Sequence, residues 1–141
     1  MGCGSRAKLT DRNLPGCRRR SLSIWLPERI VARDPNVTAL TVSRDAFINK
    51  VWINDAAAAN ARIDPHHIPG RHTREFLAPW EADIIESYIR EVIYCKVCMR
   101  RIVTLTIPTE SKRRLVRLLP LNPDAALAYL IRPDLLKGHL L

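Results

Sequence analysis

Two short segments in which apolar and polar residues alternate constrain the fold of this chain most. In the first, every second residue from Leu22 to Leu26 is apolar, a basic triplet precedes the run, and Pro27 ends it. The second segment, residues 100–108, repeats the basic pair, the alternation and the closing proline. A period of two residues is typical of a half-buried β-strand, so both segments are predicted strands and together suggest an internal repeat.

Helices are predicted behind the first strand. Residues 28–40 should form one helix, but Pro35 interrupts it, because proline has no N–H to donate and disfavours a helical residue before it. Asp34 could instead cap a shorter helix that starts at Pro35. Ser43 is a suitable N-cap for a second helix that extends to about Asn60.

The middle of the chain holds the strongest helical pattern. Residues 61–78 contain two prolines, one glycine and three histidines, a composition typical of a loop. From Pro79 to about Val97 apolar residues recur at helical spacing, and their stripe is expected to face the core. Behind the second strand, helices are predicted over 109–119 and 122–131.

A basic strand followed by a connecting segment and a capped helix resembles the ribbon-helix-helix DNA-binding family of the Arc and MetJ type. The resemblance implies a fold that is mainly α with a short antiparallel β-ribbon, to which an α+β fold is the alternative. It also implies a division of the chain into a disordered basic tail over 1–17, a first motif over 18–60, a loop with a connecting helix over 61–98, and a second, weaker motif over 99–141.

In that family the ribbon enters the major groove of double-stranded DNA, and the second helix directs its N-terminus at a phosphate. The resemblance therefore implies a sequence-specific transcriptional repressor or a plasmid-transfer accessory factor, acting as a homodimer or an intramolecular pseudo-dimer. The formal net charge of +9 agrees with a polyanionic partner. The DNA-contacting residues implied in this way are Arg18, Arg19, Arg20, Ser21, Ser23, Trp25, Ser43, Arg44, Arg101, Thr104 and Thr106.

Two other function classes stay open. The string Asp-Pro-His-His-Ile-Pro that begins at Asp64 resembles the central strand of HNH nucleases. That resemblance implies His67 as the general base and His66 as a ligand of a divalent metal ion, although the later asparagine and histidine of that family are missing. The other class is a basic protein-interaction domain without a nucleic-acid role. Outside the nuclease hypothesis no catalytic residue is expected, and the chain is not expected to be an enzyme.

The cysteines and histidines allow one metal hypothesis. Cys95 and Cys98, together with two of His66, His67 and His72, have the ligand types of a zinc site. Otherwise no cofactor is expected, and the cysteines should be reduced thiols in a cytoplasmic protein, because the N-terminus has no apolar export signal. The sequence contains no apolar run long enough to cross a membrane, so no membrane partner is expected.

Overall fold

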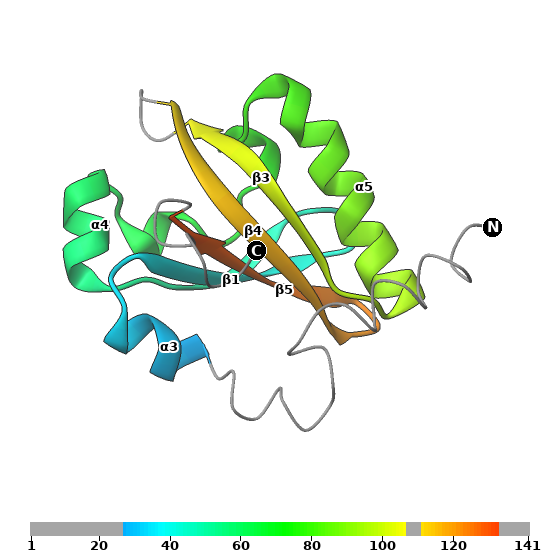
Figure 1. Cartoon of the computed structure of the whole chain (residues 1–141), viewed down its shortest axis with the longest axis horizontal. Coiled ribbons are helices and arrows are strands. Elements are labelled where there is room, and N and C mark those ends of the chain that lie inside the picture. Colours follow the sequence, from blue (N-terminus) through cyan, green and yellow to red (C-terminus); the bar gives the residue numbers. More distant parts are fainter. Residues whose placement is uncertain (1–26, 107–110, 133–141) are drawn as a thin grey trace, which may run out of the picture.

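A five-stranded antiparallel sheet organises the structure (Figure 1). The computed structural model describes residues 27–106 and 111–132. The strands follow the spatial order β2-β1-β5-β4-β3, so the first and last strands of the chain, β1 and β5, lie side by side. Their bounds are Val37–Ser43 for β1, Ile48–Trp52 for β2, Met99–Thr106 for β3, Ser111–Asn122 for β4 and Ala125–Ile131 for β5.

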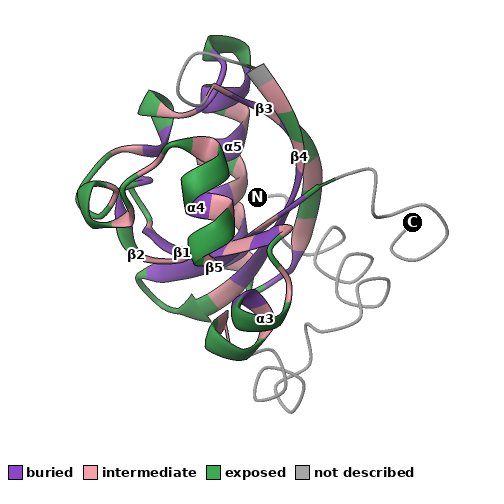
Figure 2. Cartoon of the chain, turned by 90° about the vertical axis from the view of Figure 1, so that its left-hand side faces the viewer, coloured by how far each residue is buried: buried purple, intermediate pink, exposed green. Residues whose placement is uncertain are grey.

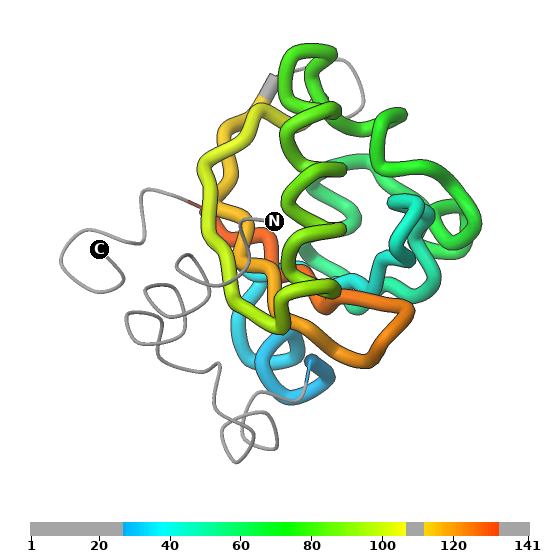
Figure 3. The backbone as a smooth tube through the Cα atoms, turned by 90° about the vertical axis from the view of Figure 1, so that its right-hand side faces the viewer, coloured from blue at the N-terminus to red at the C-terminus, as the bar shows by residue number. Residues whose placement is uncertain are grey.

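Helices cover both faces of this sheet. The long helix α5 (Pro79–Cys95) packs on the inner face, together with the helix α4 (Asp55–Ala61) and two short 3₁₀ turns, η1 (Pro65–His67) and η2 (Thr73–Glu75). These elements form the connection from β2 to β3, which carries the chain from one edge of the sheet to the other (Figure 3). The helix α3 (Pro27–Arg33) lies against the outer face.

The alternation of side chains along the strands separates two apolar clusters. Even-numbered residues of the central strands, such as Val42, Val116 and Ala128, belong to the cluster beneath α5. Their odd-numbered neighbours, such as Leu115 and Leu127, belong to the cluster beneath α3. Because successive side chains of a strand point to opposite faces, the central strands supply both clusters at once. Figure 2 shows the resulting buried band along the sheet.

The central strand β5 has a sequence that favours a helix. Its residues, Ala125–Ile131, are rich in alanine and leucine, and six of the seven are buried. A strand that is buried on both faces has a continuous apolar sequence without alternation. The hydrogen bonds of β5 to β1 on one side and β4 on the other outweigh the helical preference of its alanines and leucines. The predicted helix over 122–131 is therefore wrong. Asn122 instead begins a hairpin turn, in which its side chain accepts a hydrogen bond from the backbone N–H of Asp124 at 2.8 Å.

The structure contradicts the predicted ribbon-helix-helix fold. A mainly α fold is wrong, because five strands form the centre of the molecule. The predicted helix from Ser43 to Asn60 contains a reverse turn, the strand β2 and only then α4. The helix expected over 109–119 is β4 from Ser111 onward, and β4 pairs with β3 inside the same chain. No second chain is therefore needed to complete the predicted ribbon at this strand.

Other local predictions are confirmed. The helix predicted from Pro79 is α5, and its buried residues include Ile85, Ile89 and Val92, which lie on the predicted stripe. The strand predicted over 100–108 corresponds to β3, which ends at Thr106. Residues 107 and 108 lie outside the described residues. The strand predicted over residues 20–26 lies outside the described residues.

The Asp34-Pro35 step ends a helix, as predicted, but does not begin one. The helix α3 stops at Arg33, and Val37 already belongs to β1. In the described parts of the chain, no helix is long and apolar enough to span a membrane.

A largely buried ion pair fixes the start of α5 to the sheet. Glu81, in the first turn of α5, is only 7% exposed, and its Oε2 lies 3.1 Å from Nε of Arg101 on β3. The guanidinium group also lies over the ring of Tyr88, 5.7 Å from its centroid. The hydrogen bond to Glu81 raises the pKa of Arg101, so this side chain stays charged at every accessible pH. The pair therefore ties α5 to β3.

Removing the charge of Glu81 should destabilise the fold. Glu81→Gln keeps the side-chain shape but replaces the carboxylate acceptor by a neutral amide, which leaves Arg101 without its counter-ion. We expect the free energy of unfolding in urea to fall by about 1–3 kcal/mol. Asp45→Asn removes the same charge from an exposed turn and should change it by less than about 0.5 kcal/mol. Equal effects of the two substitutions would contradict the role assigned to the ion pair.

Candidate functional site: an apolar cavity with a basic end

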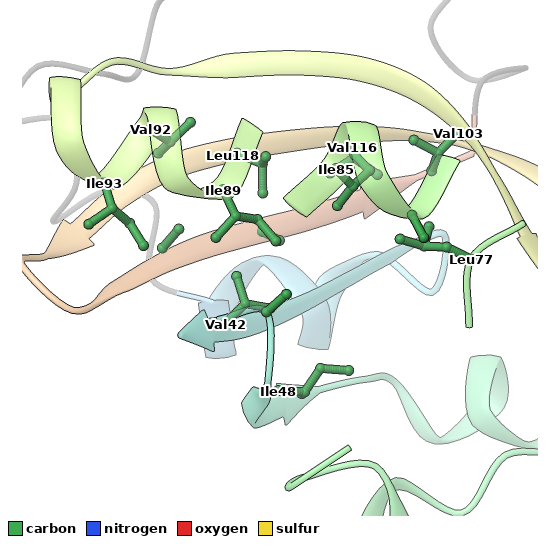
Figure 4. Packing of buried hydrophobic residues seen from close by; sticks show 14 of the residues in the cluster. Val42, Ile48, Leu77, Ile85, Ile89, Val92, Ile93, Val103, Val116 and Leu118 are labelled. Atoms are coloured by element: carbon green, nitrogen blue, oxygen red, sulfur yellow. The ribbon is translucent and has the colours of Figure 1, made fainter. Parts of the chain in front are cut away.

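A cavity of about 170 Å³ lies between the helical layer and the inner face of the sheet. Its walls are mostly aliphatic side chains that come from all five strands and from the helices α4 and α5. Figure 4 shows Ile85 and Ile89 of α5 directed toward the sheet, with Val42 on the opposite side. The principal apolar lining residues are Leu40, Val42, Ile48, Phe76, Ile85, Ile89, Val116, Leu118, Ala128 and Leu130.

Small side chains keep this cavity open. Ala128 lines it from the central strand β5, while Ala57 and Ala61 line it from α4, where they lie one helical turn apart on the same side. Larger residues at these three positions would fill the space between the helices and the sheet. An interior that is otherwise close-packed rarely keeps a void of this size, so the cavity is a candidate binding site.

The volume sets a scale for what the cavity could hold. An engineered cavity of about 150 Å³ lined by aliphatic and aromatic residues binds benzene, whereas sites for drug-sized ligands measure about 300–1,000 Å³. In its present conformation, the cavity therefore suits a molecule of a few heavy atoms.

One polar group of the wall lacks a partner. Thr73, in the 3₁₀ turn η2, lines the cavity and is 8% exposed. Its backbone N–H donates to the carbonyl oxygen of Ala46 at 2.9 Å, but its Oγ1 is buried without a hydrogen-bond partner. An unsatisfied buried hydroxyl costs about 1–3 kcal/mol, which makes it a candidate contact for a ligand.

Basic side chains gather at one end of the cavity. Lys112 and Arg114 of β4 and Arg132, just beyond β5, line it together with Asn36. The Oδ1 atom of Asn36 accepts a hydrogen bond of 3.1 Å from Nη1 of Arg132. The inner face of the sheet thus changes from aliphatic in its middle to cationic at this end.

The expected DNA-contact residues that the structure describes lie at separate places in the fold. Arg101 points to the inner face and pairs with Glu81, as described above. Thr104 and Thr106 are even-numbered residues of the same strand and therefore point to the outer face. Arg44 lies in the turn after β1, where its Nη2 is 3.9 Å from Oδ1 of Asp124.

Of the remaining predicted DNA contacts, the structure describes only Ser43. Ser43 caps no helix, because its Oγ accepts a hydrogen bond from the backbone N–H of Phe47 in the turn between β1 and β2. Residues Arg18, Arg19, Arg20, Ser21, Ser23 and Trp25 lie outside the described residues.

The histidines predicted for nuclease or zinc chemistry serve local structure. His66 and His67 are exposed in η1, where Nδ1 of His67 lies 3.5 Å from Oδ2 of Asp64. His72 caps η2, because its Nδ1 accepts a hydrogen bond from the backbone N–H of Arg74 at 3.1 Å. In the described part of the chain, these histidines belong to no group of three side chains that could hold a metal ion, so the HNH-like metal centre is not formed there.

The cysteines also differ from their prediction. Cys95 and Cys98 are both disulfide-bonded, so the expectation of reduced thiols is wrong for these two residues. Within residues 27–106 and 111–132, no three histidine, cysteine or acidic side chains come together to hold a metal ion. The alternative zinc site made of these cysteines and the loop histidines is therefore not formed there.

The cavity itself was missing from the sequence prediction. Its residues carry no motif, because they are ordinary aliphatic side chains scattered over five strands and two helices. The available signals were the residues Thr38, Leu40 and Val42 at every second position, the first two of them inside a predicted helix, and the basic residues at even positions after Ser111.

The fold is that of PAS domains. No protein-family model matches the sequence, and no curated protein matches it significantly. Among solved structures, the PAS domain of the quorum-sensing receptor RpfR from Cronobacter turicensis, in complex with C12:0, has a TM-score of 0.61 at 11% identity, over 71% of this chain and 96% of that one.

Two more PAS domains give a similar result. The PAS domain of an HTR-like protein from Haloarcula marismortui has a TM-score of 0.58 at 18% identity, over 79% of this chain and 93% of that one. The PAS domain of nitrogen regulation protein NR(II) from Vibrio parahaemolyticus has a TM-score of 0.55 at 12% identity, over 76% and 97%. At these identities the likeness establishes the fold alone. It contradicts the ribbon-helix-helix assignment, and with it the double-stranded DNA partner and the repressor or plasmid-transfer function.

The unpaired hydroxyl of Thr73 gives a test of the cavity wall. Thr73→Val replaces the hydroxyl by a methyl group of similar size, so the cost of the buried unsatisfied oxygen disappears. We expect the free energy of unfolding of the ligand-free protein to rise by about 1 kcal/mol in urea titrations. Thr104→Val, on the outer face of β3, should change it by less than about 0.5 kcal/mol. A destabilised Thr73→Val protein would show that the hydroxyl has a partner in solution.

Proposed function

We propose that this chain is a sensory binding domain that takes a small, largely apolar molecule into the cavity beneath α5. The observation that carries the proposal is the cavity itself, which is lined mostly by aliphatic side chains and has alanines on both of its sides. Burying an apolar ligand there removes apolar surface from water on both partners, which is the main driving force for such binding.

The comparisons support this class of function. One similar PAS domain was solved in complex with BDSF and again in complex with C12:0, so this fold accommodates a bound small molecule in at least that protein. Another similar domain comes from the sensor histidine kinase Ppr of Rhodospirillum centenum. In the proposed role the chain binds without catalysis, takes no metal ion, and has a small molecule and a protein as partners. Of the earlier hypotheses, a protein-interaction domain agrees with this role better than DNA binding does.

The proposed signal starts at α5. Ile85 and Ile89 line the cavity and are also part of the cluster that packs this helix on the sheet. A ligand that fills the cavity contacts α5 and the sheet at the same time, so it changes the packing between them. The occupied and empty states would then differ in the mobility of α5 on the sheet. A protein partner that binds one of these states more tightly would respond to the ligand.

Binding of a neutral apolar probe tests the proposed function. We expect 1-hexanol to shift backbone amide resonances of residues around the cavity in two-dimensional NMR spectra. At a free probe concentration ten times Kd, it should raise the free energy of unfolding by about 1.4 kcal/mol. Ala128→Leu fills the cavity and should abolish both effects.

The matched control is Ala59→Leu, which makes the same change on the exposed side of α4 and should leave binding intact. Circular dichroism of each variant would verify that its fold is retained. Failure of the wild-type protein to bind any neutral probe, or unchanged binding by a folded Ala128→Leu variant, would contradict the proposed function.

A further inference from the structure

We infer that the solvent-facing side of α5 is a dimerisation surface, on which a second copy of this chain packs with its own α5 running antiparallel. The inference goes beyond the proposed function and depends on the residues of α5 that point away from the sheet. The cavity-lining residues Ile85 and Ile89 lie on the opposite side of the same helix.

Three residues on this side of α5 follow one another at intervals of seven. Trp80 and Tyr94 are 65% and 75% exposed, and Ser87, midway between them, is exposed as well. Seven residues make nearly two helical turns, so the three form a line along α5, which lies nearest the viewer in Figure 3. Single exposed apolar side chains are common on proteins, but two aromatic rings on one line with a small residue between them suit the packing of a second helix.

A two-fold axis beside Ser87 makes this line complementary to itself. When two copies of α5 pack antiparallel about such an axis, residues at equal distances before and after Ser87 meet. Trp80 and Tyr94 are each seven residues from Ser87, so the indole of each copy meets the phenol ring of the other. The small Ser87 side chain allows the two helices to approach to the distance of about 8–10 Å that is usual for packed helices.

The charges beside this line fit the antiparallel arrangement. Asp83 and Arg90 are exposed on one flank, four residues before and three residues after Ser87. The two-fold axis keeps this flank on the same side but reverses the helix direction, so Asp83 of each copy lies beside Arg90 of the other. A parallel pair would instead bring Asp83 to Asp83 and Arg90 to Arg90, which like-charge repulsion disfavours. On the other flank, Ile84 of each copy lies beside Glu91 of the other, without a like-charge contact.

Asp83 also forms an ion pair within its own chain. Its Oδ1 lies 2.5 Å from Nη2 of Arg74, and its side chain is nevertheless 82% exposed. An ionised carboxylate has two oxygens and accepts hydrogen bonds from several donors. The contact with Arg74 therefore orients Asp83 and leaves it accessible to an arginine of a second copy.

Sedimentation equilibrium of the ligand-free full chain measures this association. One helix face is smaller than the interfaces of about 1,200–2,000 Å² that hold stable complexes, so we expect a weak dimer with a Kd of about 0.1 mM. Trp80→Ser removes a ring from each end of the interface and should weaken the dimer at least about tenfold. The control Ile102→Ser changes an exposed apolar residue on the opposite face of the sheet and should leave the Kd unchanged.

Charge reversal tests the antiparallel pairing. Asp83→Arg replaces two attractive contacts by two repulsive ones and should weaken the dimer about tenfold. Adding Arg90→Asp to the same chain exchanges the two charges and should return the Kd to within about threefold of the wild-type value. Asp45→Arg makes the same change of net charge in an exposed turn and should leave the Kd unaltered. Circular dichroism would verify that each variant is folded, and Trp80→Ser keeps the inference testable if Asp83→Arg is not.

Intermolecular NOEs in a sample that mixes labelled and unlabelled chains identify the orientation. Contacts between the rings of Trp80 and Tyr94 of different chains are expected, whereas contacts between the two Trp80 rings alone would overturn the antiparallel pairing. A wild-type chain that stays monomeric at about ten times the expected Kd would also overturn the inference. So would a double variant as weak as Asp83→Arg alone, or an equal loss in Asp45→Arg. These measurements use no ligand, so their failure leaves the proposed function standing.

Discussion

The packing of α5 across the inner face of the sheet is the interaction on which the rest of the structure depends. Ile85 and Ile89 supply its apolar contacts, and the ion pair between Glu81 and Arg101 fixes its first turn to β3. A largely buried ion pair contributes little net stability, because desolvation offsets most of the attraction, but its 3.1 Å contact holds the first turn of α5 in one register against β3. That register determines which side chains surround the cavity.

The cavity is accompanied by features that lower the stability of the ligand-free protein. Alanines at the centre of β5 and on α4 stand where larger residues would stabilise the core, and the hydroxyl of Thr73 is buried without a partner. Both features reduce stability in the ligand-free protein and both are located at the same void. Their coincidence is the physical basis for treating the cavity as a binding site, and a bound molecule would recover part of the lost stability.

The two faces of the sheet use buried polar groups differently. On the outer face Arg117 of β4 lies opposite Tyr129 of β5, and both are less than one-tenth exposed. Burial raises the pKa of Tyr129 to about 12, so the phenol stays protonated at neutral pH. Burial and the charge of Arg100 lower the pKa of Arg117. On the inner face, the basic side chains are instead gathered at one end of a cavity.

The sequence alone determined the elements whose signals are local. The helical period from Pro79, the alternation before Thr106 and the stop at Pro35 depend on neighbouring residues only, and all three correspond to observed features. The strand identity of Ala125–Ile131 and the cavity were decided by tertiary structure. Alanine and leucine prefer a helix in isolation, and only hydrogen bonding between β1 and β4 makes this segment a buried strand. A void between elements distant in sequence leaves no local pattern, because its walls meet only after the sheet has formed.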